Sequence, residues 1–438
     1  MVYPRYCALS PSFKESPVSA IESLAEATEF YVNSPAPFAP LPRPAQHAHI
    51  ITSDEEAIAI AHQLAQQFAP GAARRDRDGI LPVAELDAFS QSGLWGINIP
   101  RQYGGAGVSY ATVAKVIAII SAADSALGQI PQNHLAGVAH LLEDGSESQK
   151  QTLLAGVLSG LRWGNAFSEK GTATVADFKT TVRQHHGELV VNGEKFYATG
   201  ALLAHLVHTV AVDDEGRANL VVLDRNASGL TVINNWSSFG QRTTASGTVL
   251  LNNVHAPLDR LIPVWQAFER PTAAGPISQI IQAAVDTGIA RGTLADTLTF
   301  IREKSRPWID SGKERASDDP FTIAAIGDLQ IRLHAAEALL WRAGELIDVA
   351  LATPDEATVA AATVATAEAK VLSTEIAILA GNKLFELAGT RSTLAEYQLD
   401  RHWRNARTHT LHDPVRWKYF HVGNYYLNDV NPPRHAWN

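Results

Sequence analysis

Several residue types and sequence features are scarce or missing in this chain of 438 residues. Cys7 is the only cysteine, so the chain can form neither an internal disulfide nor a metal site built on cysteines. The 36 Lys and Arg are outnumbered by 45 Asp and Glu, a balance that argues against a nucleic-acid surface. No apolar run reaches the roughly 18 residues of a membrane-spanning helix, and the N-terminal residues lack the apolar stretch of a secretory signal. We therefore expect a cytoplasmic protein with no nucleic-acid or membrane partner and no metal.

Three short motifs that would indicate common cofactors or catalytic centres are also missing. The stretch GGAGVSY at 104–110 has the wrong spacing for a dinucleotide-binding G-x-G-x-x-G, and no predicted strand precedes it. Neither a phosphate-binding G-x-x-x-x-G-K-[ST] nor a zinc-binding H-E-x-x-H occurs. The sequence thus gives no sign of a nicotinamide site, a nucleoside triphosphate site or a zinc protease.

Apolar residues, by contrast, are plentiful. They make up 46% of the chain and charged residues 18%, enough to build large cores, and the length suggests more than one domain. Residues 1–51 differ from the rest and are predicted to form an extended arm or linker, because proline removes backbone donors. The prolines of this arm that lie close together are at positions 35, 37, 40, 42 and 44.

The three segments that follow have different periodicities. Ser53 and Glu56 have the spacing of a capping box, and helical patterns continue to about residue 161, near 109–124, 131–143 and 147–158. Residues 162–262 contain short β-rich runs, with a hairpin predicted at Asn192-Gly193 and a turn at 213–216. From 263 to 438 the pattern is helical again, with helices expected at 276–304, 317–351, 355–388 and 396–422. An α+β protein with the order α, β, α follows.

Three stretches of the middle segment have a familiar pattern: WGNAFSEKGTATVADFKT, NGEKFYATGALLAHLVHTVAV and FGQRTTASGTVLLNNVHAP. Together they resemble the acyl-CoA dehydrogenase superfamily. The resemblance extends over about residues 52–425. It implies an N-terminal helical domain at 52–161, a middle antiparallel β domain at 162–262 and a C-terminal helical bundle at 263–438.

Later stretches resemble one branch of that superfamily, the flavin-dependent monooxygenases of dibenzothiophene oxidation and sulfur acquisition. They are QNHLAG at 132–137, IREKSRPW at 301–308 and RHWRNARTHTLHDP at 401–414. The resemblance implies reduced FMN, delivered by a separate NAD(P)H:flavin reductase. It also implies reaction of this flavin with oxygen to a C4a-hydroperoxyflavin, and oxygenation of a small organosulfur compound. A chain that receives its flavin already reduced needs no nicotinamide site, in agreement with the missing motif.

His409 and His412 are the candidate catalytic pair. Residues three apart share one face of a helix, and a histidine can donate a proton near neutral pH. We expect His412, more than His409, to donate to the distal oxygen of the peroxide. The alternative is a surface pair stabilised at the C-terminal end of a helix. Tyr103, in the glycine-rich loop, is expected to line the substrate cavity, although its glycines also fit an ordinary loop.

The cofactor is expected to contact short polar and aromatic side chains at the ring and arginines at the phosphate. Arg302, Arg306 and Arg404 are the phosphate candidates, although arginines on a salt-bridged surface face would look alike. Asn133 and Ser168 are expected to serve both the flavin and the reaction, although a helix cap and a strand-end turn are the simpler interpretations. The remaining ring candidates, for which core packing is the main alternative, are Trp163, Asn165, Tyr197, Thr199 and Asn405.

Two rival functions stay open at this point. The first is an FAD-dependent acyl-CoA dehydrogenase with Asp413 as the base, because Asp413-Pro414 stands where many dehydrogenases have a catalytic Glu-Gly. The second is a flavin-free scaffold whose arm binds a partner. Gly389, at the end of a long helix, resembles a turn that approaches flavin across a subunit boundary in the superfamily, which implies a homodimer or homotetramer.

Overall fold

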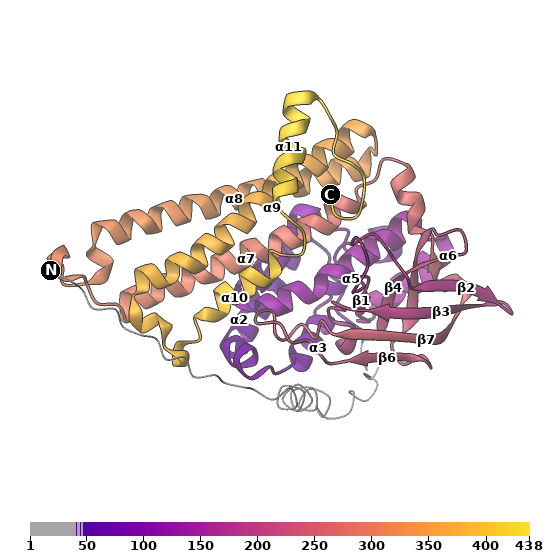
Figure 1. Cartoon of the computed structure of the whole chain (residues 1–438), viewed down its shortest axis with the longest axis horizontal. Helices are drawn as coiled ribbons and strands as arrows, with labels where there is room; N and C mark the ends of the chain where they lie inside the picture. The colour runs from indigo at the N-terminus through magenta and orange to yellow at the C-terminus, as the bar shows by residue number, and fades with distance from the viewer. Residues whose placement is uncertain (1–40, 42–43, 45–46) are drawn as a thin grey trace, which may run out of the picture.

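The computed structural model describes residues 41, 44 and 47–438. The proline-rich arm predicted at 1–51 therefore lies mostly outside the described residues. A helical part, a sheet and a second helical part follow one another along the chain, as the sequence predicted (Figure 1). Within the described part of the chain, no helix is both long enough and apolar enough to cross a membrane.

The first helical part contains α2 (Asp54–Asp78), α3 (Val83–Gln91), α4 (Tyr110–Ala123), α5 (Ser125–Asp144) and α6 (Glu147–Leu158). Ser53 caps α2 by accepting a hydrogen bond from the Glu56 N–H. The Glu56 carboxylate accepts from Thr52 instead of Ser53, so the predicted capping box is half formed. Helix α5 begins six residues before the predicted start at Pro131, because the side chain of Asp124 caps it.

The middle part is one sheet whose strand order is β6-β7-β3-β2-β4-β5-β8, with β1 paired to β4. The prediction of a purely antiparallel sheet is wrong, because β1 and β4 run parallel and β2 also meets β4 in parallel. The strands are β1 (Trp163–Ala166), β2 (Thr181–His185), β3 (Glu188–Lys195), β4 (Leu206–Val212), β5 (Ala218–Asp224), β6 (Leu230–Ile233), β7 (Thr248–Pro257) and β8 (Leu261–Ile262). The predicted turn at 213–216 joins β4 to β5.

The hairpin predicted at Asn192-Gly193 is six residues from the real one. The chain reverses at His186 and Gly187, whose φ angles of 49° and 84° suit a tight hairpin turn between β2 and β3. Gly193 instead lies inside β3 at an irregularity of its pairing with β7. A side chain at Gly193 would collide with Thr180, so glycine is needed there for close packing of backbones and not for a turn.

The second helical part contains α7 (Ala274–Glu303), α8 (Pro320–Ala352), α9 (Glu356–Ala388), α10 (Asp400–His409) and α11 (Arg416–Asn428). The single helix predicted at 396–422 is wrong, because Pro414 disfavours helical backbone at the residue before it and the chain turns between α10 and α11. Helix α7 packs on α4 and α9, and α5 contacts both β1 and α7. In Figure 1, α11 stands out from the bundle.

Candidate active site

The predicted histidine pair lies where α10 ends. His409 is the last residue of α10 and His412 lies in the turn that follows, so the two do not share a helical face. Their rings nevertheless contact each other, with centroids 4.6 Å apart. His409 is fully buried while His412 is exposed, which rules out a simple surface pair.

His409 is anchored to the helical bundle by Asp286 of α7. Its Nδ1 lies 2.5 Å from Asp286 Oδ1, and Lys370 Nζ of α9 lies 2.9 Å from Asp286 Oδ2. All three side chains are buried. Burial alone would raise the pKa of the Asp286 carboxyl, but the charge of Lys370 and hydrogen bonds from His409 and Lys370 hold that pKa far below its usual range.

His412 is held by two hydrogen bonds. Its Nδ1 lies 2.7 Å from the His409 carbonyl oxygen, and its Nε2 lies 3.2 Å from the side-chain nitrogen of Gln129. Partial covering of the ring by the surrounding chain, together with the neighbouring His409, lowers the pKa of His412. Gln129 is buried on α5 one turn before Asn133, so His412 and Asn133 face the same side of that helix.

Four of the predicted cofactor residues form a group at the end of β1. The Asn165 N–H donates to the Thr199 carbonyl at 3.0 Å, and the Asn165 side chain donates to the Tyr197 carbonyl at 3.2 Å. Ser168 belongs to the same group, because its carbonyl accepts a hydrogen bond at 2.9 Å from the N–H of Phe196, the residue before Tyr197. Tyr197 has a left-handed φ of 58° and is 51% exposed, a strained position that turns its ring outward.

Asn133 and Trp163 lie next to this group through α5. His134, the neighbour of Asn133, accepts a hydrogen bond at Nδ1 from the Trp163 backbone N–H at 3.0 Å. The Trp163 ring is buried between His134 and His208, with centroid distances of 6.1 Å and 5.7 Å. Trp163 thus packs as a core residue, while Asn133 is half-buried.

Several buried polar atoms around α5, β1 and α10 lack a hydrogen-bond partner among the described residues. Buried polar groups are normally satisfied, so a cluster of unsatisfied ones calls for a ligand or water. The set contains both a donor and acceptors: Gln129 Oε1, Trp163 Nε1, Asn165 Oδ1 and His409 Nε2.

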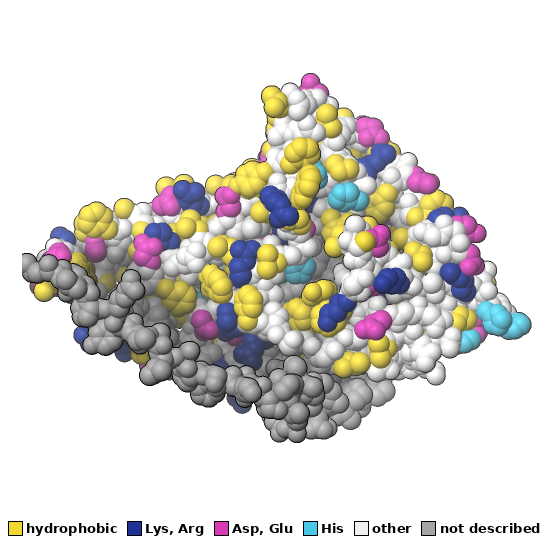
Figure 2. Space-filling model, in the orientation of Figure 1, with side chains coloured by type: hydrophobic (Ala, Val, Ile, Leu, Met, Phe, Trp, Pro, Cys, Tyr) yellow, Lys and Arg dark blue, Asp and Glu magenta, His cyan; other side chains and the backbone are white. Residues whose placement is uncertain are grey.

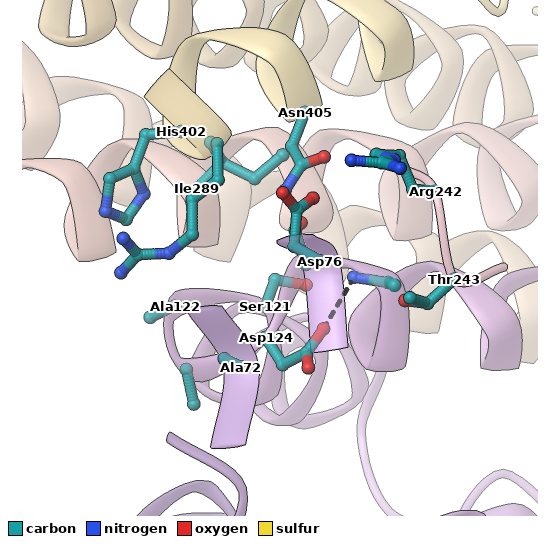
Figure 3. A pocket seen from close by; sticks show the side chains of 14 residues that line it. Ala72, Asp76, Ser121, Ala122, Asp124, Arg242, Thr243, Ile289, His402 and Asn405 are labelled. Atoms are coloured by element: carbon teal, nitrogen blue, oxygen red, sulfur yellow. Dashed lines mark hydrogen bonds between the residues drawn. The ribbon is translucent and has the colours of Figure 1, made fainter. Parts of the chain in front are cut away.

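Arg404 and Asn405 lie in the middle of α10. Arg404 is paired with Asp76 at 2.6 Å and with Asp400 at 2.7 Å, so two carboxylates already match its charge. Asn405 accepts a hydrogen bond from the Gln241 N–H at 2.6 Å. Figure 3 shows Asn405 facing Asp76 across a small pocket of about 30 Å³, which is too small for a flavin ring.

A larger hollow of about 940 Å³ lies beside this pocket, between the sheet part and the segment that leads into α10. Trp236, Phe239, Arg242 and Arg404 contribute to its wall. The Tyr197 ring contacts Trp236 at a centroid distance of 6.0 Å, which places the strand-end group next to the same hollow.

The other predicted residues lie elsewhere. Arg306 and Gly389 line a separate hollow of about 850 Å³ at the end of α9, and Arg302 is exposed in the last turn of α7. Along α7, 16 residues separate Asp286 from Arg302, or about 24 Å. Tyr103 packs near α6, where its hydroxyl donates to Glu147 at 3.0 Å.

Sequence reasoning missed Asp286, Lys370 and Gln129. The signal for Asp286 was present, since it is the one acidic residue in the apolar stretch PISQIIQAAVDTG. A lone charge in such a stretch is buried at a cost and needs a partner. Asp413, the candidate base, is itself buried and paired with Lys418 at 3.4 Å.

Comparison with known proteins places these features in a family. Models described as the N-terminal, middle and C-terminal domains of acyl-CoA dehydrogenase match residues 53–161, 165–254 and 280–417. A dibenzothiophene monooxygenase of Rhodococcus qingshengii is 33% identical, with 87% of this chain and 95% of the relative covered. A probable FMNH2-dependent monooxygenase of Pseudomonas putida, SfnC, is 31% identical, with 88% of this chain and 98% of the relative covered.

Solved structures agree with the sequence comparison. The crystal structure of FMN-bound TdsC from Paenibacillus sp. A11-2 superposes with a TM-score of 0.83 at 32% identity, covering 87% of this chain and all of that one (100%). The architecture that the resemblance implied is therefore confirmed, apart from the mixed sheet. This chain belongs to the acyl-CoA dehydrogenase family.

Proposed function

We propose that this chain is the oxygenase component of a two-component monooxygenase that uses reduced FMN and oxygenates a small organosulfur compound. The relatives named as dibenzothiophene and FMNH2-dependent monooxygenases support this reaction class. The observation that carries the proposal is the His409–His412 pair, which is fixed on a buried carboxylate and contacts α5 beside unsatisfied polar atoms.

FMN fits the residues at this place. The edge of an isoalloxazine ring carries one N–H donor and several oxygen and nitrogen acceptors, so it can satisfy a mixed set of orphaned donors and acceptors. Asn165 Oδ1 and Gln129 Oε1 can accept from such an edge. The outward-turned Tyr197 ring can lie against the isoalloxazine.

The chain's own residues hold and orient the flavin, and they keep water away from it. The chemistry that bound reduced FMN supplies is transfer of two electrons to dioxygen, with a C4a-hydroperoxide as the donor of one oxygen atom and the other leaving as water. Asn133, Asn165 and Ser168 orient the ring edge from α5 and β1. The apolar core around Trp163 keeps water away, which protects a labile oxygen donor. His412 faces the reacting oxygens, with His409 behind it.

The dehydrogenase alternative is less well supported. A catalytic base must reach the substrate α-carbon. Asp413 is buried and its carboxylate is directed to Lys418 of α11, so it is committed to an ion pair. An FAD enzyme of this kind would purify yellow and lose its colour with an acyl-CoA.

The proposal includes a homodimer or homotetramer. Arg302 lies about 24 Å along α7 from Asp286, the partner of His409, and Arg306 lies beyond the end of that helix. We propose that both contact the FMN phosphate bound to another subunit. Exposed apolar side chains along α11, visible in Figure 2, offer a surface for such an association. They are Trp417, Tyr419, Phe420, Tyr426 and Leu427.

The test compares flavins and substrates directly. We expect tighter binding of reduced FMN than of oxidised FMN or of FAD in either state. We also expect oxygen-dependent conversion of dibenzothiophene or dimethyl sulfone with photoreduced FMN and no CoA thioester. A separate flavin reductase with NADH should replace the photoreduction. Tight FAD binding with bleaching by an acyl-CoA, and no sulfur product, would contradict the proposal in favour of the dehydrogenase. Failure to bind either flavin would favour the scaffold.

A further inference from the structure

Asp286 and Lys370 form an ion pair in the middle of the helical bundle, where neither side chain is exposed. The pair brings α7 and α9 together, with Thr374 of α9 as a further donor to Asp286 Oδ2 at 3.4 Å. A buried ion pair contributes little net stability, because desolvation of both charges offsets their attraction. The contact of Asp286 with His409 offers a second role for the pair.

The geometry fixes where the hydrogen of His409 lies. A carboxylate only accepts hydrogen bonds, so the 2.5 Å contact from His409 Nδ1 to Asp286 Oδ1 places the hydrogen on Nδ1. Lys370 occupies the other oxygen and keeps the carboxylate ionised. A neutral His409 then has its lone pair at Nε2, the atom that has no partner among the described residues.

The same reasoning applies to His412. Its Nδ1 lies 2.7 Å from a carbonyl oxygen, that of His409, and a carbonyl also only accepts. The hydrogen of His412 is therefore on Nδ1, and its Nε2 accepts from the Gln129 amide at 3.2 Å. The orientation of His412 thus depends on the backbone of His409, which is anchored through its ring to Asp286.

We propose that Asp286, held by Lys370, is the positioning residue that keeps the hydrogen of His409 on Nδ1 and anchors the His409 carbonyl, which in turn keeps the hydrogen of His412 on Nδ1. The Nε2 of His412, which accepts from Gln129 in the flavin-free chain, is then an acceptor for a flavin-side donor that takes the place of the Gln129 amide. The inference rests on the proposed function and deepens it. It reverses the direction predicted from the sequence, in which His412 donates a proton. The charged groups around the histidines are Asp286 and Lys370, with the Asp413–Lys418 pair beside Lys370.

Two substitutions separate a positioning role from simple stabilisation, because they change the protonation of His409 in different ways. In Asp286→Asn, Lys370 retains the amide oxygen and the amide NH2 faces His409, which forces the hydrogen from Nδ1 to Nε2. In Lys370→Met, Asp286 stays charged without its cation, and His409 takes up a proton to neutralise it. A purely structural pair would give lower stability in both variants and no change in the protonation of His409.

The readout is ¹⁵N NMR of the full chain labelled at histidine, without flavin. We expect the protonated signal of His409 to move from Nδ1 to Nε2 in Asp286→Asn. In Lys370→Met both ring nitrogens of His409 should carry a proton at a pH where the unmodified chain shows only the Nδ1 proton. Glu337→Gln is the matched control, because Glu337 of α8 pairs with Arg291 of α7 away from the histidines and should leave their signals unchanged.

With reduced FMN and oxygen, Asp286→Asn should lose about 10²-fold in turnover, the scale of one acid–base contribution, with substrate KM little changed. Unchanged His409 and His412 signals in either folded variant would overturn the inference. If Asp286→Asn does not fold, Lys370→Met decides alone. Shifted histidine signals in a chain that shows no oxygenation would reject the proposed function and keep the positioning role. Normal oxygenation with unshifted histidine signals would keep the proposed function and reject the positioning role.

Discussion

At the scale of single residues, buried histidines lower the stability of the fold when the pH falls. His134 and His140 of α5 and His208 of β4 are buried, and burial lowers their pKa values to about 3, 4 and 3. His134 bridges the Trp95 carbonyl and the Trp163 N–H, while His208 has no hydrogen-bond partner among the described residues. They are neutral core residues, and they make the fold sensitive to acid.

The first prediction concerns pH. In the unfolded chain a histidine titrates near pH 6.5, whereas these three titrate well below that when folded. The unfolded state therefore binds more protons below pH 6.5, and stability is complete above that pH and falls as the pH drops toward 4. Each histidine should cost about 1.4 kcal/mol per pH unit, measured by urea unfolding at pH 7.5, 6 and 5.

A substitution isolates one contribution. His208→Leu should remove about a third of this slope, because leucine does not titrate. His62→Gln, at an exposed position of α2, is the control and should leave the slope unchanged. An equal slope in His208→Leu and the unmodified chain would show that His208 does not limit acid stability.

The second prediction concerns the residues that hold Ser168 in place. Lys195 is buried and pairs with Glu169 at 2.7 Å, and its Nζ also donates to the Phe167 carbonyl at 3.0 Å. Lys195→Met should destabilise the chain by about 3–5 kcal/mol, because Glu169 is left as an uncompensated charge. Urea unfolding measures the loss, and adding Glu169→Gln should recover most of it. A double variant as unstable as the single one would contradict this account.

At the scale of elements, α7 and α4 approach so closely that only glycine fits between them. A Cβ at Gly288 would collide with the Ala118 carbonyl and lie 2.5 Å from Ser121 Cβ, and one at Gly292 would collide with Ala122. This contact sets the position of α7, and therefore of Asp286 beneath His409.

The third prediction follows from this packing. Gly288→Ala should destabilise the chain by about 1–3 kcal/mol through overpacking. Gly327→Ala in α8 is the matched control, since nothing lies within 4 Å of its Cβ, and it should stabilise by about 0.5–1 kcal/mol by restricting the unfolded chain. Thermal and urea unfolding measure both. Equal effects at the two positions would mean that α7 shifts freely on α4.

At the scale of the whole molecule, the predicted site is divided between distant ends of the helical bundle. The histidines lie at the end of α10, whereas Arg302, Arg306 and Gly389 lie at the far ends of α7 and α9. A site built from two subunits would reunite them.

The fourth prediction tests that arrangement by complementation. His412→Ala and Arg302→Ala should each be nearly inactive with reduced FMN. When the two are co-expressed, a mixed dimer has one site with both substitutions and one with neither, so up to half of the activity per mixed dimer should return. Light scattering after gel filtration checks the assembly. No recovery in a confirmed mixed dimer would place both residues in one chain's site or outside it.

The sequence alone was enough for the order of the three parts and the limits of most helices. Asn165, Ser168, Tyr197 and Thr199 were candidates for the flavin through the resemblance, and they meet because they lie close along the chain or across one sheet connection. It failed at Asn192-Gly193, where a favourable turn dipeptide was used for close backbone packing, and at Pro414, where a periodic pattern ran across a break.

Only the tertiary structure determined the environment of the histidines. Residues 129, 286, 370 and 409 are far apart in sequence and meet because α5, α7, α9 and α10 pack side by side. The hydrogens on the two imidazoles depend on which atoms those helices bring within 3 Å. Periodicity determines which residues are buried, but the partner of a buried charge is set by the distances between helices, and a linear pattern does not contain them.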